Sequence, residues 1–208
     1  MKTTLKLVAL LLTITLTSCN ANLNLGEGID GSGNVVTEKR NLDASFTKID
    51  ASSGVEVIVE QGAPTEVEVE VDDNLLEHII TKVENGTLIV KIEGNINTME
   101  SAIVRVRTNT INGLEASSGA SIRSKSNLRG TNIAIKTSSG STIQAELEYE
   151  KVSCESTSGS EIKVSGKALA LDTKSSSGSE IEAQDLAANE IVAQSTSGSS
   201  TTLNPIVL

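Results

Sequence analysis

The triplet Ser/Thr-Ser-Gly recurs along the carboxyl-terminal half of the chain at a nearly constant spacing. Aligning the triplets gives separations of 21, 19, 19 and 20 residues between the glycines, which are Gly119, Gly140, Gly159, Gly178 and Gly198. A repeat of this length cannot bury an apolar face by itself and relies on neighbouring repeats for its core. The spacing therefore predicts a solenoid.

Apolar residues alternate with polar ones on both sides of each glycine, and this period of two indicates strands. A coil of about 20 residues at roughly 3.3 Å per residue has a perimeter of about 66 Å. We expect a closed coil with three faces, in which each strand pairs in parallel with its equivalent one repeat later. The third residue after glycine illustrates the pattern, being Ile122, Ile143, Ile162, Ile181 and Thr201.

The glycines are expected at tight corners, because glycine adopts backbone angles that other residues avoid. Small hydroxyl residues at the same corner stack without collision and form hydrogen bonds with turn backbone. The predicted corner ladder adds Ser118, Ser139, Ser158, Ser177 and Ser197 to the five glycines. A nucleophilic serine would need a nearby base, and the one histidine, His78, is distant in sequence. We therefore interpret the ladder as structural.

The amino-terminal half, residues 29 to 110, also alternates but with a less regular period. Asn85-Gly86 predicts a tight hairpin turn, and residues 73–80 fit a short helix or a strand. Ser53-Gly54 is interpreted as an outlying copy of the corner, 65 residues before Gly119 and so close to three coils plus an insertion. This half is expected to be the same solenoid interrupted by a hairpin excursion.

Residues 1–18 are typical of an export signal, because Lys2 and Lys6 precede an apolar run too short to span a bilayer. Leu16-Thr17-Ser18-Cys19 resembles a lipobox, which predicts lipidation at Cys19 and a tether over 19–30. The alternative is a plain secretory signal with an incidental cysteine. Lipidation of Cys19 would leave Cys154 as the last thiol, so no intramolecular disulfide is expected.

Composition limits the classes of partner. The net charge is −10 at pH 7, which argues against binding nucleic acid, since that requires clustered Lys and Arg. The aromatic residues are Phe46 and Tyr149 alone, so the core must be filled by Val, Ile, Leu and Ala. Scarce aromatics also argue against tight glycan binding by ring stacking.

Several segments together resemble one family, the putative auto-transporter adhesins with a head GIN domain (DUF2807). The segments are Gly31 to Val36, Phe46 to Asp50, Ser53 to Val57, Asn74 to Leu76 and Val83 to Leu88. The resemblance implies a domain over 31–208, a right-handed parallel β-helix, frequent lipid anchoring and a source among Bacteroidetes-type bacteria. It implies no active-site motif, because the family has no settled biochemical activity. The chain departs from the family pattern in ending soon after Asn204-Pro205, so its last coil is expected to be short or differently capped.

Four features of the sequence are candidate sites. His78 is interpreted as a partly exposed structural residue, and Cys154 as a buried, unreactive thiol. Glu161 and Glu180 are equivalent in adjacent repeats and could form a carboxylate dyad, but nearby lysines favour a solvated face. The segment Asp30 to Asn34 lacks the spaced acidic ligands of a calcium loop, so we assign it to a turn. No catalytic residue, metal or cofactor is predicted.

The sequence predicts an exported lipoprotein of the outer membrane, at the cell surface or on the periplasmic face. The primary hypothesis is an adhesin or structural module without catalysis. The alternatives are an envelope protein that acts on or binds polysaccharide, and a periplasm-facing scaffold or sensor. The expected partners are the membrane through the lipid anchor, and a surface protein or glycan whose identity stays open. An open solenoid edge also favours a homo-oligomer.

Overall fold

The structure is a computed structural model that describes residues 28–42 and 44–204. The export signal, Cys19 and most of the tether lie outside the described residues. The described part is all-β, as predicted, and none of its helices is long and apolar enough to cross a membrane. The elements are β1 (Ile29–Asp30), β2 (Val35–Arg40), β3 (Lys48–Ser52), β4 (Glu56–Gln61), β5 (Glu66–Asp72), η1 (Asp73–His78), β6 (Ile79–Glu84), β7 (Thr87–Ile92), β8 (Ile96–Thr98), β9 (Ala102–Thr108), β10 (Gly113–Ala116), β11 (Ser121–Ser124), β12 (Leu128–Thr137), β13 (Thr142–Ser156), β14 (Glu161–Ser175), β15 (Glu180–Ser195) and β16 (Ser200–Leu203).

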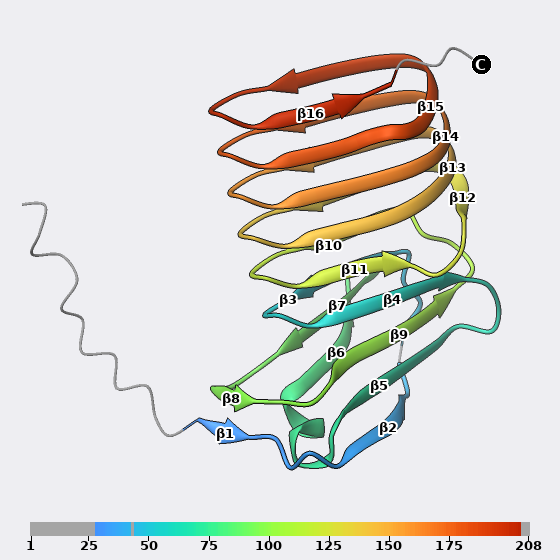
Figure 1. Cartoon of the computed structure of the whole chain (residues 1–208). Coiled ribbons are helices and arrows are strands. Elements are labelled where there is room, and N and C mark those ends of the chain that lie inside the picture. The colour runs from blue at the N-terminus through green and yellow to red at the C-terminus, as the bar shows by residue number, and fades with distance from the viewer. Residues whose placement is uncertain (1–27, 43, 205–208) are drawn as a thin grey trace, which may run out of the picture.

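From β10 onward the described strands pair in parallel, each with its equivalent in the next repeat. Leu128 lies opposite Leu147, which lies opposite Gly166, a step of 19 residues in both cases. Figure 1 shows the resulting ribbons stacked one above another. The predicted parallel pairing at the repeat spacing is therefore confirmed in this half.

The core is a set of buried columns that run through the stack. Ile122, Ile143, Ile162 and Ile181 follow one another in register and are each at most 1% exposed. Burying such a side chain stabilises the fold by about 1.5–3 kcal/mol. As predicted, aliphatic residues fill most of the core, and both aromatic side chains are buried within it at 4% exposure.

The amino-terminal half is interleaved with the stack. β3 pairs with β10 on one side and β7 on the other, while β4 pairs with β11 and β9. The coil made of β3 and β4 therefore lies between the coil of β7 and β9 and that of β10 and β11. Gly54 donates its N–H to the carbonyl of Ser118 over 3.1 Å. The prediction of three coils between Gly54 and Gly119 was wrong, because the two corners are direct neighbours.

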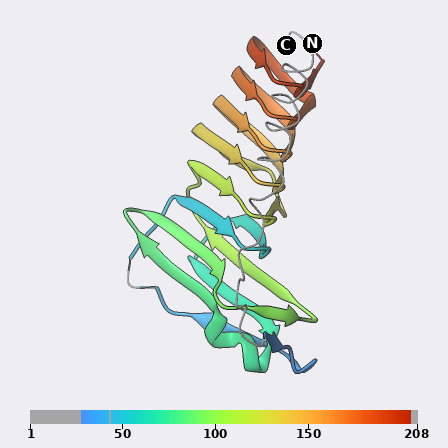
Figure 2. The same cartoon turned by 90° about the vertical axis from the view of Figure 1, so that its left-hand side faces the viewer.

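The expectation that the strands are all parallel needs a second correction. β2 pairs antiparallel with β5, β5 with β9, and β6 with β7. Short connections such as Gly62–Thr65 cannot return the chain to a parallel strand, which needs a longer crossover. Figures 1 and 2 show these strands closing the end of the stack that lies opposite β16.

The predicted hairpin is confirmed. β6 and β7 pair antiparallel around Asn85 and Gly86, which have φ of 50° and 74°. Both alternatives for residues 73–80 hold in part, because η1 occupies Asp73–His78 and β6 begins at Ile79.

Candidate functional site

The predicted corner residues lie at turns that join one strand to the next along the chain, such as β10 to β11. In each corner both residues have positive φ, between 50° and 58° for the serines and between 68° and 74° for the glycines. Two successive left-handed residues are typical of a type I′ turn, in which glycine avoids a steric cost that serine bears. The five corner serines are exposed.

The hydrogen-bond ladder at this corner is made by the backbone. The N–H of Gly119 donates to the carbonyl of Ser139 over 3.1 Å, and that of Gly140 to the carbonyl of Ser158 over 3.2 Å. Gly159 and Gly178 repeat the contact with Ser177 and Ser197. The exposed serine side chains are thus left facing solvent, while the corner backbone ties neighbouring coils together.

The hydroxyls that hold the corner from inside follow the glycines, and sequence reasoning missed them. Ser141, Ser160 and Ser179 are only 1% to 2% exposed. Ser141 donates to the carbonyl of Ala116 over 2.7 Å, and Ser179 to that of Ser156 over 2.7 Å. The signal was present, because serine follows glycine in four successive repeats.

Replacing Ser160 by alanine is expected to lower the free energy of unfolding by about 1 kcal/mol. Its Oγ lies 2.7 Å from the Thr157 carbonyl and 3.0 Å from Thr137 Oγ1, so the change removes buried hydrogen bonds. Urea unfolding measures the effect. The control is Ser153→Ala on the outer face of the same coil, for which we expect a change within about 0.5 kcal/mol; equal losses would contradict the assignment.

The segment Asp30 to Asn34, assigned to a turn, is held by two carboxylates where β5 ends and η1 begins. Asp72 is fully buried and accepts the N–H of Glu100 over 2.9 Å and that of Gly33 over 2.6 Å. Asp73 accepts the Ser32 hydroxyl over 2.5 Å and the Asn34 amide over 2.9 Å. These oxygens are occupied by hydrogen bonds, and no group of three His, Cys, Asp or Glu in the described residues could hold a metal ion.

The hydrogen bonds that Asp72 and Asp73 accept are expected to weaken in acid. Hydrogen bonding from the Glu100 N–H, and then from Gly33, lowers the pKa of Asp72, and Ser32 and Asn34 lower that of Asp73. A lowered folded-state pKa contributes stability that is complete above the unfolded value of about 3.9 and is lost as the pH falls through the folded value. Hydrogen exchange of residues 29–34, corrected for intrinsic rates, should show lower protection at pH 3 than at pH 6. Asp72→Asn should lower protection already at pH 6. Unchanged protection in both tests would contradict the conclusion that these two carboxylates hold the segment.

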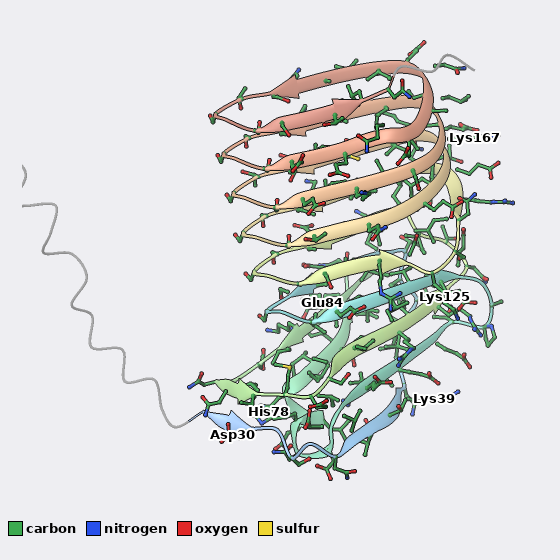
Figure 3. All side chains as sticks on the ribbon, viewed as in Figure 1. Asp30, Lys39, His78, Glu84, Lys125 and Lys167 are labelled. Atoms are coloured by element: carbon green, nitrogen blue, oxygen red, sulfur yellow. The ribbon has the colours of Figure 1, made fainter. Side chains whose placement is uncertain are left out.

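Three other features have the exposure and position that the sequence predicts. His78 is partly exposed, and its Nδ1 lies 2.8 Å from the Glu93 carbonyl. Cys154 is buried, and burial followed by the charge of Asp172 raises its thiol pKa to about 12. Glu161 and Glu180 are register partners on an outer face. Figure 3 places His78 and Asp30 together at the closed end of the stack.

A charged depression of about 410 Å³ crosses β4, β5, β9 and β11. Its cations are paired, since Arg123 Nε lies 2.6 Å from Glu56 Oε1 and Lys125 Nζ lies 3.0 Å from Glu60 Oε2. The Lys125 hydrogen bond, with Arg107 close by, lowers the pKa of Glu60. Figure 3 shows Lys125 on the same side as Lys39, which pairs with Glu66 and Glu68. Because its charges compensate one another, this surface offers little net attraction to a charged ligand.

A second depression, of about 790 Å³, lies where β12 begins. None of the described residues that line it is acidic. The side chain of Gln61 lies along the strand edge there, donating to the carbonyl of Arg129 over 2.9 Å and accepting its N–H over 2.7 Å. Beneath it, Tyr149 Oη donates to the Ile111 carbonyl over 2.7 Å, and burial raises the tyrosine pKa to about 12. The lining residues are Gln61, Asn109, Thr110, Asn112, Arg129, Gly130, Thr131, Asn132, Ile133, Ala134, Lys151 and Ser153.

Sequence reasoning also missed a carboxylate pair. Asp50 of β3 and Glu115 of β10 are register partners in a hollow of about 210 Å³. Desolvation, followed by the charge of Glu115, raises the pKa of Asp50. A carboxyl that protonates more readily can serve as a general acid. The sequence signal was that each residue stands four positions before a corner glycine, Gly54 or Gly119. This signal could be used only with the knowledge that the two corners are adjacent.

Solved structures with the same fold come from Bacteroides and Parabacteroides species. A "putative adhesin" from Bacteroides fragilis NCTC 9343 is 22% identical, with a TM-score of 0.78 over 85% of this chain and 83% of that one. A "putative adhesin" from Parabacteroides merdae ATCC 43184 is 22% identical, with a TM-score of 0.70 over 86% and 85%. A third, from Parabacteroides distasonis ATCC 8503, is 21% identical, with a TM-score of 0.70 over 84% of each chain. No curated protein matches the chain.

At the level of sequence, the profile of a single family matches residues 45–206. The match covers the interleaved coils and the regular stack alike, and thus most of the chain. This protein belongs to the DUF2807 family, described as "Putative auto-transporter adhesin, head GIN domain".

Proposed function

We propose that this protein is a lipid-anchored envelope protein whose β-sheet stack is a non-catalytic adhesion module at the cell surface. The family description supports adhesion, and the segment Leu16 to Cys19 supports an anchor at Cys19. We further propose that the coils wind as a right-handed β-helix. Parallel pairing at each step of about 20 residues supports this winding, since crossovers between parallel strands are right-handed in the great majority of proteins.

The observation that carries the adhesion proposal is the 790 Å³ depression at the start of β12, whose described lining holds amides, hydroxyls and two cations but no carboxylate. Arg129 pairs with Glu148 over 3.1 Å, whereas Lys151 has no carboxylate partner among the described residues. The chain as a whole has a net charge of −10, so most of its surface would repel an acidic ligand. The described lining of this depression lacks carboxylates and holds Lys151, and the depression therefore suits an acidic polar ligand.

The ligand class proposed for this depression is an acidic polysaccharide. Phe46 and Tyr149 are both buried, so no ring is available for stacking on sugars. Recognition would rest on hydrogen bonds from the Asn and Gln amides and on the charge of Lys151, because hydrogen bonds to charged groups are the stronger kind.

Titration with polygalacturonate, compared with neutral dextran, tests this proposal. Lys151→Glu should weaken polygalacturonate binding by roughly 10- to 150-fold, since loss of a charged hydrogen bond costs roughly 1.5–3 kcal/mol. Lys174→Glu makes the same charge change outside the depression and should bind as the natural chain does. Equal weakening by both variants, or equal binding of dextran, would contradict a specific site.

A second candidate is hydrolysis of polysaccharide, which the Asp50–Glu115 pair favours. A pair of carboxyl groups, one of them a general acid, performs this chemistry in glycosidases. Release of reducing ends from polygalacturonate, lost in Asp50→Asn, would support the enzyme and overturn the non-catalytic proposal.

A further inference from the structure

The carboxyl-terminal end of the stack leaves strand edges without a partner among the described residues. β16 pairs only with the first part of β15, and the rest of β15 pairs only with β14. The backbone groups on the outer edge of residues 191–195 and of β16 therefore face out of the end of the stack (Figure 1). Such an edge is a template for adding another strand.

Residues of the last coil that continue the core columns are more exposed than their register partners in the coil before. Ala193 and Ser195 are exposed, although their register partners Thr173 and Ser175 are 0% and 3% exposed. Leu203 is only partly buried, whereas its partner Ala183 is 1% exposed. Among the described residues, therefore, none covers the interior side of the strands in the last coil.

Charge distinguishes this end from the other open edges. The edge strands at the closed end carry charges of both signs, with Arg40 pairing with Glu38 over 3.0 Å and Lys82 with Glu84 over 2.8 Å. Charged side chains are how natural edges resist strand addition. Residues 186–204 contain Glu190 as their single charged residue.

We infer that the open end binds the same end of a second copy of this chain. In a two-fold contact the same surface of both copies is brought together, so a face with charge of one sign would repel itself while this nearly uncharged face does not. The facing strands would run antiparallel and the exposed columns would complete each other's core. The charged, antiparallel closed end offers no matching surface, so the contact makes a closed pair and not a filament.

The pairing has a consequence that rests on the proposed lipid anchor at Cys19. β1 lies at the opposite end of the stack from β16 (Figures 1 and 2). An end-to-end pair therefore places its two β1 strands far apart, on opposite sides. Anchored copies would then join two facing membranes, which is a homophilic form of adhesion.

Light scattering coupled to size exclusion tests the interface on the chain from residue 20 onward. We expect a mass twice that of the single chain, falling to one chain in Ala193→Glu, which adds charge to the exposed column. Leu169→Glu is the matched control, because Leu169 is 55% exposed on the outside of β14 and should leave the pair intact. A monomer at 100 µM, or a pair that Leu169→Glu breaks and Ala193→Glu does not, would overturn the proposal.

A chain that ends at Asn204 tests whether residues 205–208, and not a second copy, cover the open end. Pairing that appears only after residues 205–208 are removed would show that this tail covers the end, and would overturn the proposal. Vesicles carrying the mature chain through maleimide coupling at Cys19 should aggregate, and should not with Ala193→Glu. A pair in solution without vesicle aggregation would overturn the facing-membrane arrangement alone, while failure to bind polygalacturonate would overturn only the proposed ligand.

Discussion

Replacing Gly166 by alanine is expected to lower the free energy of unfolding by about 3–5 kcal/mol. Gly166 has a φ of 110°, which L residues rarely adopt, and an added Cβ would lie 2.1 Å from the backbone oxygen of Leu147. That oxygen belongs to a strand paired on both sides and cannot move away. The backbone of two coils would have to shift to accept one methyl group.

Thermal unfolding measures this effect, and we expect a fall in Tm of about 10 °C. Gly159→Ala is the matched control, because Gly159 also has a positive φ but nothing within 4 Å of its added Cβ. It should cost only about 1 kcal/mol. Equal losses in the two variants would contradict the close approach at Gly166.

Leu147→Ala is expected to cost about 3 kcal/mol. Leu147 is 0% exposed and lies between Leu128 and Gly166 of the adjacent coils. The paired backbones on both sides prevent collapse, so the change would leave a cavity. Urea unfolding should show a lower midpoint with little change in slope.

The next residue supplies the control for this prediction. Glu148→Ala removes an exposed side chain that pairs with Arg129 over 3.1 Å, and surface pairs contribute about 1 kcal/mol or less. If Glu148→Ala were the more damaging change, the side chains of β13 would point opposite to the directions described here.

The regular half of the fold could be predicted because its information is local. Each repeat carries its own corner and its own alternation, so the columns through Ile143 and Ile162 follow from the spacing of the glycines. The hairpin at Asn85-Gly86 is local in the same sense, because the turn residues alone favour it.

The interleaving of the first half could not be predicted, because the partners are distant in sequence. β3 meets β10 across about 65 residues, and nothing near Ala51 specifies Ala116 as its partner. The candidate sites depend on this arrangement. Gln61 reaches Arg129 only because β4 is next to β11, and the Asp50–Glu115 pair exists only because β3 is next to β10.

The corner shows a subtler limit. The pattern Ser-Gly-Ser identified the turn, but not which hydroxyl is buried. Sequence reasoning favoured the serine before glycine, whereas the serine after it, as at Ser160, lies inside. Ala120 and Val55 hold the equivalent position in the earlier coils, which shows that the site accepts small apolar residues as well.

Labelling intact cells with a membrane-impermeant amine reagent tests the surface adhesion account most directly. Lys39 and Lys125 have side-chain exposures of 68% and 64%, so a surface protein offers both to the reagent. Mass spectrometry should find both residues modified in intact cells that leave a periplasmic control protein unmodified, and Cys19→Ser should release the labelled protein from the cells. Modification only after the outer membrane is opened would contradict a surface adhesin and place the protein, with its partners, in the periplasm.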